Sequence, residues 1–327
     1  MKKKHVLQWH ITHKCNLRCL HCYQEDYKED LGINEIKNIF YQYISFLNEY
    51  NYRGHINITG GEPFLLPDFF EVIDLFEQNN ITFGILTNGT LLNEEIVRRL
   101  SSYKNLSFVQ ISLDGTKRMH DSIRGKGNFK KSLRGIKLLN KYNIESMVAF
   151  TVHKKNYNKL KSVIRLVKRK KVKVFWVDRL IPTETYEDII SSKEFLKVAK
   201  IMWKESEKAK SEKNCVTDIR VNRALMFQGG SNTIYHCSAG TELLTILANG
   251  DLLPCRRLPI IIGNTLDRDI IELYKSSPVI KYLKENEIPI ACKKCYKANK
   301  CRGGLKCLSY AITGKIGNKD INCELFK

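Results

Sequence analysis

The sequence has no hydrophobic run long enough to cross a membrane. Its first apolar stretch, MKKKHVLQWHIT, is short and is interrupted by His and Gln, whereas a membrane helix needs about 20 apolar residues. There is no internal repeat, and with 43% hydrophobic residues over 327 positions nothing requires disorder. We expect a globular protein of the cytoplasm, without a membrane partner, that builds one large domain and a smaller one.

Acidic residues are scarce, since 34 Asp and Glu stand against 55 Lys and Arg and give a formal charge of +21. Such a balance raises nucleic acid or an acidic partner as a hypothesis. The lysines, however, are spread along predicted helix faces at 161–173 and 193–213, which is typical of a solvated surface. The charge therefore does not favour nucleic-acid binding.

Cysteine, by contrast, is frequent. Of the eleven cysteines, all but Cys215 fall between residues 15 and 22 or between 237 and 323. Disulfides are rare in a reducing compartment, so grouped thiols indicate metal binding. The segment 291–323 also has too few apolar residues to fold alone, as is typical of a module held by metal.

Strands and helices are predicted to alternate along the first half of the chain. Six β-branched or aromatic runs indicate strands at 5–11, 55–59, 83–87, 107–113, 146–152 and 173–177. Helical periodicity marks the segments between them, including 34–50, 68–79, 93–103 and 130–142. This alternation predicts an α/β fold of parallel β/α units, closed or partly closed like a barrel.

Four polar motifs follow the first four predicted strands. They are the cysteine cluster CNLRCLHCY (15–23), GGEP (60–63), TNGT (87–90) and SLDG (112–115). Because a parallel β/α barrel carries its chemistry on the loops after its strands, these motifs are expected to share one rim. Farther on, 235–258 reads as a hairpin around Asn249-Gly250-Asp251.

The three cysteines Cys15, Cys19 and Cys22 are spaced three and two residues apart. Such a loop can ligate three corners of a four-iron cluster and leave the fourth iron open for a small molecule. A zinc loop or plain buried thiols are the alternatives.

The motifs CNLRCLHCY, TGGEP, LTNGT and SLDG, in this order over roughly residues 5–190, resemble those of the radical S-adenosylmethionine enzymes. The resemblance implies a partial (β/α)6 TIM-like barrel. It also implies a [4Fe–4S] cluster on Cys15, Cys19 and Cys22 whose open iron binds S-adenosylmethionine. Reductive cleavage of that cofactor would give a 5′-deoxyadenosyl radical that abstracts hydrogen from the substrate.

Further cofactor contacts are predicted from the same motifs. Gly60 and Gly61 would let the backbone approach the ligand, and Glu62 would bind the methionine ammonium. Tyr23 would lie against adenine, Asn88 and Ser112 would hydrogen-bond the ribose or carboxylate, and Arg124 would pair with the carboxylate. A strand-capping Asn or a surface Arg is the structural alternative at these positions.

The C-terminal cysteines resemble the SPASM extension of the same family, a seven-cysteine module with two auxiliary [4Fe–4S] clusters. The resemblance assigns an inner and an outer set of ligands: Cys237, Cys255 and Cys307 for the inner cluster, and Cys292, Cys295, Cys301 and Cys323 for the outer one. The spacing before Cys307 is five residues instead of the usual three, which makes this ligand less secure. His236 and Cys215 are candidates for the missing fourth ligand, and a zinc ribbon is the alternative for the C-terminal cysteines.

This resemblance predicts a barrel over 1–190, a bridging helical segment over 191–230 and a SPASM module over 231–327. It implies a maturase of a ribosomally made peptide, with a thioether or carbon–carbon cross-link as the favoured product and epimerisation as an alternative. A basic surface could attract an acidic leader peptide. A separate leader-binding protein is a further expected partner, because the chain begins almost at its first strand, and a flavodoxin- or ferredoxin-type reductant is another.

Two other functions stay open at this point. One is maturation of a protein side chain, as in anaerobic sulfatase-activating relatives, or of a peptide-derived cofactor. The other is a zinc-stapled nucleic-acid-binding protein, which would require GGEP and SLDG to be coincidental. Asp178 and Arg179, after the sixth predicted strand, could face the substrate or form a structural ion pair.

Overall fold

The computed structural model describes residues 2–24, 30–182, 187–285 and 287–325. The chain divides into two compact units. The first holds Met1–Arg18, Cys22–Gln110 and Ser238–Asn286, and the second holds Cys19–His21, Ile111–Cys237 and Glu287–Lys327. No helix in the described ranges combines the length and the apolar character that crossing a bilayer requires.

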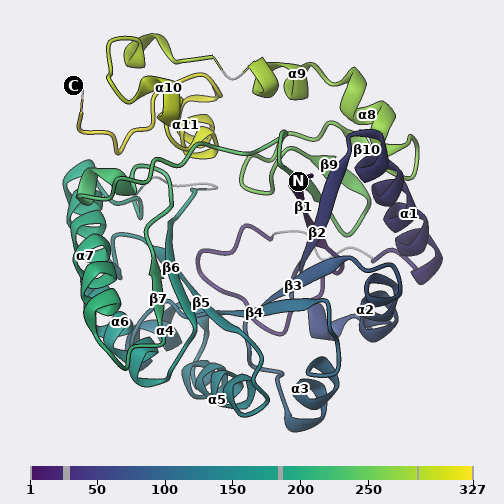
Figure 1. The fold of residues 1–327 in the computed structure, drawn as a ribbon, viewed down its shortest axis with the longest axis horizontal. Helices are drawn as coiled ribbons and strands as arrows, with labels where there is room; N and C mark the ends of the chain where they lie inside the picture. Colours follow the sequence, from purple (N-terminus) through teal and green to yellow (C-terminus); the bar gives the residue numbers. More distant parts are fainter. Residues whose placement is uncertain (1, 25–29, 183–186, 286, 326–327) are drawn as a thin grey trace. The chain divides into compact units, whose positions relative to one another are not determined.

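The first unit is built on parallel strands that alternate with helices (Figure 1). β1 pairs with β2, and β2 with β3, all parallel. Its strands and helices up to residue 110 are β1 (Lys3–His10), α1 (Ile33–Glu49), β2 (Tyr52–Thr59), the 3-10 turn η1 (Pro63–Leu65), α2 (Phe69–Gln78), β3 (Thr82–Thr87) and α3 (Glu94–Leu100). β4 (Leu106–Ser112) ends in the second unit.

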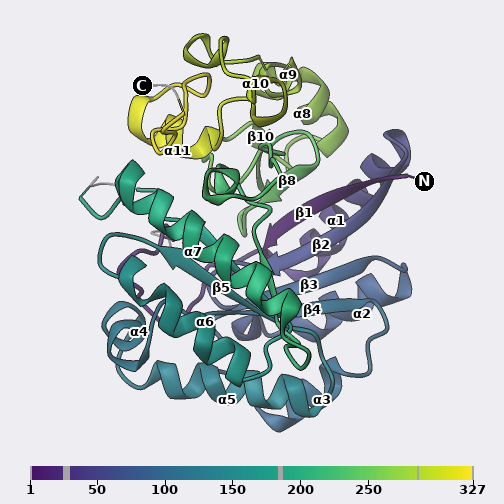
Figure 2. The ribbon, with the colours of Figure 1, turned by 60° about the vertical axis from the view of Figure 1, so that its left-hand side comes forward.

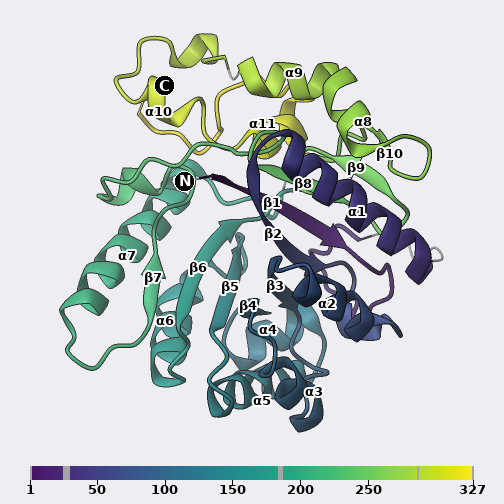
Figure 3. The same ribbon diagram turned by 45° about the vertical axis from the view of Figure 1, so that its right-hand side comes forward.

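Aromatic side chains fill the space between these strands and helices. Trp9 of β1 stacks on Phe76 of α2 with ring centroids 6.2 Å apart, and Phe40 of α1 stacks on Phe76 at 5.3 Å. All three are almost fully buried, and each such side chain contributes about 1.5–3 kcal/mol by leaving water. Figure 3 shows α1 running alongside β1 and β2.

The predicted hairpin is present and extends the same sheet. β8 (Leu243–Ile246) and β9 (Asp251–Leu253) are antiparallel, and β8 also pairs in parallel with β1. Gly250 lies in the turn between β8 and β9 at φ 87°, a backbone conformation that residues with side chains rarely adopt. The remaining elements of this unit are β10 (Gly263–Asn264), α8 (Ile270–Ser276) and α9 (Pro278–Glu285).

The second unit continues the alternation with three parallel strands. β5 (Ser146–Val152) pairs with β6 (Val174–Arg179), and β6 pairs with the short β7 (Asp218–Arg220). Figure 2 shows α6 and α7 side by side. The helices and turns of this unit are α4 (Lys117–Arg124), α5 (Asn128–Lys141), η2 (Tyr157–Lys159), α6 (Leu160–Arg169), α7 (Ser192–Ser211), η3 (Met226–Gly229), η4 (Ile290–Cys292), α10 (Ala298–Cys301) and α11 (Lys306–Thr313).

All six predicted strands and the hairpin are confirmed. Several elements were not predicted, among them α4, which is short and almost wholly polar, and β7, which has three residues. The pairing of β8 with β1 was not predicted either, since it joins segments more than 230 residues apart. The predicted boundaries at 190 and 230 stay a prediction.

Candidate functional site

The loop that carries the first cysteines leaves β1 through a hydrogen-bonded anchor. Asp30 accepts from the Thr12 hydroxyl and from the backbone N–H of His13, both at 2.6 Å. Thr12 Oγ1 in turn accepts from the N–H of Lys14 at 3.0 Å. These bonds fix the direction in which the chain approaches Cys15.

Two of these cysteines receive backbone hydrogen bonds. The N–H of Leu17 donates to Cys15 Sγ and the N–H of Gln24 donates to Cys22 Sγ, both at 3.4 Å. Burial raises the pKa of Cys15. Because N–H donors to sulfur stabilise a thiolate that ligates iron, the local backbone fits an iron–sulfur ligand.

The two glycines of GGEP are required by a close backbone approach. A Cβ on Gly60 would lie 2.4 Å from the carbonyl oxygen of Thr12, and one on Gly61 would lie 2.2 Å from that of Lys14. The N–H groups of Gly61 and Glu62 donate to these same carbonyl oxygens at 2.8 Å. The glycines thus seat the end of β2 against the cysteine loop, and their predicted contact with a ligand stays a prediction.

Glu62 is fully buried at the end of β2. Its two carboxylate oxygens accept from the Thr87 hydroxyl at 2.6 Å and from the Asn88 N–H at 2.9 Å. These hydrogen bonds hold the carboxylate in place between the loops after β2 and β3.

Asn88 connects the loop after β3 to the first cysteine loop. Its amide donates to Asn16 Oδ1 at 2.9 Å, and Asn16 donates to the Thr90 hydroxyl at 2.9 Å. Asn88 Oδ1 accepts from the Thr90 N–H and hydroxyl. Asn16 and Thr90 were not predicted to matter, although both lie inside motifs that the sequence singled out.

In the second unit, Asp114 of SLDG is the centre of a buried charged cluster. It accepts from Arg124 Nε at 2.5 Å, lies 3.3 Å from His21 Nε2, and accepts from the Thr151 N–H at 2.9 Å. Burial alone would raise the pKa of this carboxyl, but Arg124 and His21 hold it well below its usual range. Asp114 is therefore an anion at neutral pH.

Arg124 is the side chain that links this cluster to Cys19. Its Nη1 lies 3.8 Å from Cys19 Sγ, and its Nη2 lies 3.4 Å from His21 Nε2. The sequence predicted that Arg124 pairs with the carboxylate of S-adenosylmethionine. In the structure Arg124 pairs with a carboxylate of the protein itself, that of Asp114. Ser112, the other predicted residue here, is half-buried at the end of β4.

Tyr23 lies beside a second arginine in the first unit. The guanidinium of Arg256 is centred 4.5 Å from the Tyr23 ring, and its Nη2 donates to the Tyr23 carbonyl oxygen at 2.6 Å. Tyr23 is half-buried, and burial raises its pKa. Arg256 was not predicted to matter, although it directly follows a predicted ligand, Cys255.

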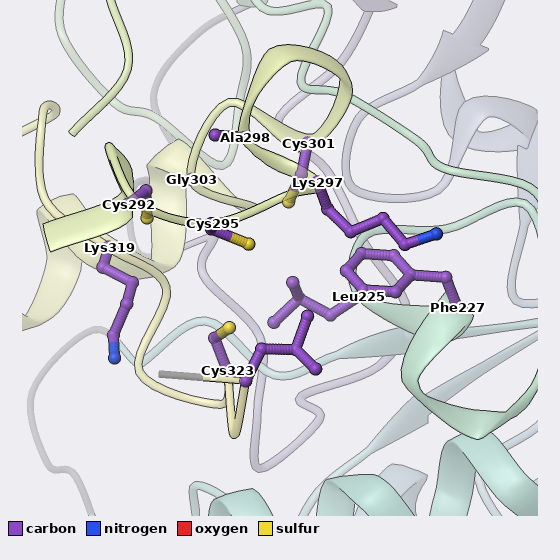
Figure 4. A pocket seen from close by; sticks show the side chains of 11 residues that line it. Leu225, Phe227, Cys292, Cys295, Lys297, Ala298, Cys301, Gly303, Lys319 and Cys323 are labelled. Atoms are coloured by element: carbon purple, nitrogen blue, oxygen red, sulfur yellow. The ribbon is translucent and has the colours of Figure 1, made fainter. Parts of the chain in front are cut away.

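The four cysteines predicted for an outer cluster line one pocket (Figure 4). We call it the four-cysteine pocket; it consists of Cys292, Cys295, Cys301 and Cys323, with Leu225, Phe227, Lys297 and Lys319 beside them. Burial raises the pKa of Cys301 to about 11, so its free thiol is protonated at neutral pH. Among the described residues, no three His, Cys, Asp or Glu side chains form a compact site for a single ion. Four cysteines that line one pocket are the ligand set that a four-iron cluster uses.

A buried ion pair holds the tail that supplies Cys323. Arg179, at the end of β6, donates to both oxygens of Asp320 at 2.7 Å and to Asn322 Oδ1 at 2.9 Å. The side chains of Arg179 and Asp320 are 3% and 0% exposed. Of the two roles considered for Arg179, the structural ion pair is the one that the contacts support.

The three cysteines predicted for an inner cluster differ in burial. Cys307 is buried on α11, next to Lys306, whose pKa burial lowers and the Cys237 thiolate raises. Cys255 belongs to the first unit and is half-buried. Of the two candidates for a fourth ligand, Cys215 lies 3.8 Å from the Thr217 carbonyl oxygen, and the ring of His236 stacks on Tyr235.

Two family models match this chain. Residues 9–167 match the radical SAM superfamily, and residues 237–296 match an iron–sulfur cluster-binding domain, SPASM. A curated relative, the antilisterial bacteriocin subtilosin biosynthesis protein AlbA of Bacillus subtilis, is 31% identical over 94% of this chain and 67% of its own length. The chain belongs to the radical SAM superfamily. The mycofactocin maturase MftC of Mycobacterium ulcerans is 28% identical over 97% of this chain and 87% of its own.

Among solved structures, Streptococcus suis SuiB bound to S-adenosylmethionine matches 99% of this radical SAM chain and 78% of its own, with a TM-score of 0.79 and 16% identity. SuiB has also been solved with its precursor peptide SuiA. The partial-barrel fold, the SPASM domain and the assignment as an enzyme that uses S-adenosylmethionine and iron–sulfur cofactors are confirmed. The zinc-stapled nucleic-acid-binding hypothesis required the motifs to be coincidental and is set aside.

Proposed function

We propose that this radical SAM enzyme modifies a ribosomally made precursor peptide by hydrogen abstraction and oxidative cross-linking, with a thioether or carbon–carbon bond as the product. The observation that carries the proposal is the pair of cysteine sites within one chain: the loop after β1, and the four-cysteine pocket. SuiB, whose structure contains a precursor peptide, and MftC, which is a maturase by name, support a peptide substrate.

The first site would hold a [4Fe–4S] cluster on Cys15, Cys19 and Cys22. When bound, this cluster and S-adenosylmethionine supply the reductive cleavage that gives a 5′-deoxyadenosyl radical. The chain's own part is to bind and orient. The proposed cofactor contacts are Tyr23, Gly60, Gly61, Glu62, Asn88, Ser112 and Arg124. Hydrogen bonds fix a buried anion in the first unit, Glu62, and a charged pair in the second, Asp114 with Arg124.

The second region would hold two auxiliary [4Fe–4S] clusters, which makes three in all. Cys292, Cys295, Cys301 and Cys323 would ligate the outer one, and their common pocket supports this set. Cys237, Cys255 and Cys307 would ligate the inner one. Auxiliary clusters can take up the electron that the substrate gives up, which is why an oxidative product is favoured over epimerisation.

The expected partners are a precursor peptide, a separate leader-binding protein and a flavodoxin- or ferredoxin-type reductant. A formal charge of +21 favours an acidic leader peptide over a basic one. Maturation of a protein side chain is the alternative, and the choice of substrate in the assay separates the two.

The test begins with iron, sulfide and zinc analysis of the anaerobically reconstituted chain. About twelve irons per chain would support three four-iron clusters, whereas zinc with no iron would contradict the proposal. Short peptides encoded beside the gene are then incubated with S-adenosylmethionine and reductant, and their masses are measured. With the wild-type enzyme we expect the peptide to lose the mass of two hydrogens for each cross-link. With Cys22→Ala the peptide mass should not change. Arg220→Gln, which removes an exposed ion pair with Asp218, is the control and should leave the product unchanged.

A further inference from the structure

Tyr23 and Arg256 join the two cysteine regions within the first unit. Tyr23 directly follows Cys22, a proposed ligand of the first cluster, and Arg256 directly follows Cys255, a proposed ligand of the inner auxiliary cluster. Arg256 Nη2 donates to the Tyr23 carbonyl oxygen at 2.6 Å, and its guanidinium is centred 4.5 Å from the Tyr23 ring. We call this contact the Tyr23–Arg256 bridge. It is one hydrogen bond between two residues that each neighbour a proposed ligand.

The bridge is fixed to the sheet on the Arg256 side. The backbone N–H of Arg256 donates to the hydroxyl of Thr245, which is fully buried on β8. β8 pairs with β1, so this anchor belongs to the same sheet from which the first cysteine loop departs. This bond fixes the backbone of Arg256 beside β8, and the contacts with Tyr23 orient its guanidinium.

Among the described residues, Arg256 has no carboxylate partner. Its Nε is buried and has no hydrogen-bond partner among those residues. Nearby His10 is 2% exposed, and neither of its ring nitrogens has a hydrogen-bond partner among the described residues. Arg256 is half-buried, and a partly desolvated cation is stabilised by a nearby negative charge. Each residue of the bridge directly follows a cysteine whose thiolate carries negative charge: Cys22 precedes Tyr23, and Cys255 precedes Arg256.

We propose that Arg256 is a positioning residue shared by two sites: its guanidinium compensates the charge on both the Cys22 and the Cys255 thiolates and so raises the reduction potentials of both clusters together. This inference rests on the proposed ligand sets. A fixed cation beside an iron–sulfur cluster favours the form that carries one more electron. One side chain would thus set the reduction potentials of both clusters, instead of a separate environment for each.

The experiment is a redox titration of the reconstituted enzyme followed by electron paramagnetic resonance. The signal that changes on adding S-adenosylmethionine identifies the first cluster, and the signal lost in Cys307→Ala identifies the inner one. In Arg256→Gln, the ratio of reduced to oxidised cluster at a fixed solution potential should fall about tenfold at both sites, which corresponds to about 59 mV for one electron. The outer cluster should not change.

Arg257→Gln is the matched control, because it removes the neighbouring charge, which acts on Tyr23 more weakly than that of Arg256. It should shift both potentials less than Arg256→Gln does. Arg256→Lys retains a cation but not the planar geometry that bonds the carbonyl and covers the ring. The reduction potentials of both clusters in Arg256→Lys should therefore lie between those of the wild type and those of Arg256→Gln. If the glutamine variant does not fold, the lysine variant tests the inference in its place.

Unchanged potentials at both sites, or a shift at one site only, would overturn the inference. Such a result would leave the proposed function intact, because iron content and peptide modification would be unaffected. A wild-type chain without iron, by contrast, would remove the proposed function before any variant is compared.

Discussion

The first cysteine loop and the four-cysteine pocket differ in what holds them. The first loop departs from a buried strand, and polar side chains fix it from neighbouring segments: Asp30 at its entry, Asn88 at Asn16, and Arg124 near Cys19. The four-cysteine pocket is formed by η4, α10 and the tail, each only a turn or two long. Its main polar attachment is the pair Arg179–Asp320.

This difference indicates two ways of building a metal site. Where a rigid sheet supports the loop, the chain can define the site before the metal binds. Where only short turns surround the thiols, the bound group supplies much of the folding free energy. The four predictions that follow, from the largest expected effect to the smallest, test whether the two regions differ in this way.

Removal of the clusters should affect the two regions most unequally. After chelation of iron under anaerobic conditions, the amides of 290–323 should exchange hydrogen to within about tenfold of the rate of an unfolded chain. The amides of β1, β2 and β3 should keep their protection, because aromatic burial and strand pairing hold them. Hydrogen exchange with mass spectrometry measures both in one sample. Equal protection of 290–323 before and after chelation would contradict the comparison.

Loss of the Arg179 charge should release the tail. In Arg179→Met, Asp320 becomes a buried anion without its partner, which destabilises the fold by roughly 3–5 kcal/mol. We expect a lower Tm in thermal unfolding and a loss of about four irons per chain, since Cys323 is on that tail. Arg220→Gln is the control, because it breaks an exposed ion pair with Asp218 and should change stability by at most about 1 kcal/mol. Similar effects of the two variants would disprove the role of the buried pair.

The contrast also explains what the sequence could and could not predict. Strand periodicity predicted β1 to β6 because each carries a run of apolar, β-branched residues, and motif order placed the polar loops after them. The partner of Arg179 is Asp320, which lies 141 residues later in the chain. No local sequence pattern predicts an ion pair between residues so far apart. Likewise, the role of Gly61 is decided by the carbonyl of Lys14, which only the folded backbone brings within reach.

Asp114→Asn tests the charged cluster beside Cys19. Loss of the anion weakens charge-assisted hydrogen bonds to Arg124 and His21 and should lower stability by about 1.5–3 kcal/mol. The pKa of Asp114 is depressed in the folded state. Its stabilisation is therefore present above the unfolded-state pKa, about 3.9, and is lost as pH falls toward the folded-state value.

Denaturant unfolding of the wild type and Asp114→Asn, followed from pH 7 down to about pH 3, measures this dependence. The difference in unfolding free energy should stay constant above about pH 5 and shrink below about pH 4. A difference that grows on acidification would show that the cluster is not held by the Asp114 charge.

The smallest effect is expected at Asn16, where the first loop meets the loop after β3. Asn16→Ala removes two neutral hydrogen bonds, one with Asn88 and one with Thr90. The free energy of unfolding should fall by only about 1 kcal/mol, because Asn16 is exposed and the other attachments of the loop remain. Asn16→Asp, which can still accept from Asn88, should recover part of this. A loss as large as that of Arg179→Met, measured by Tm, would mean that the first loop depends on a single contact in the same way as the tail.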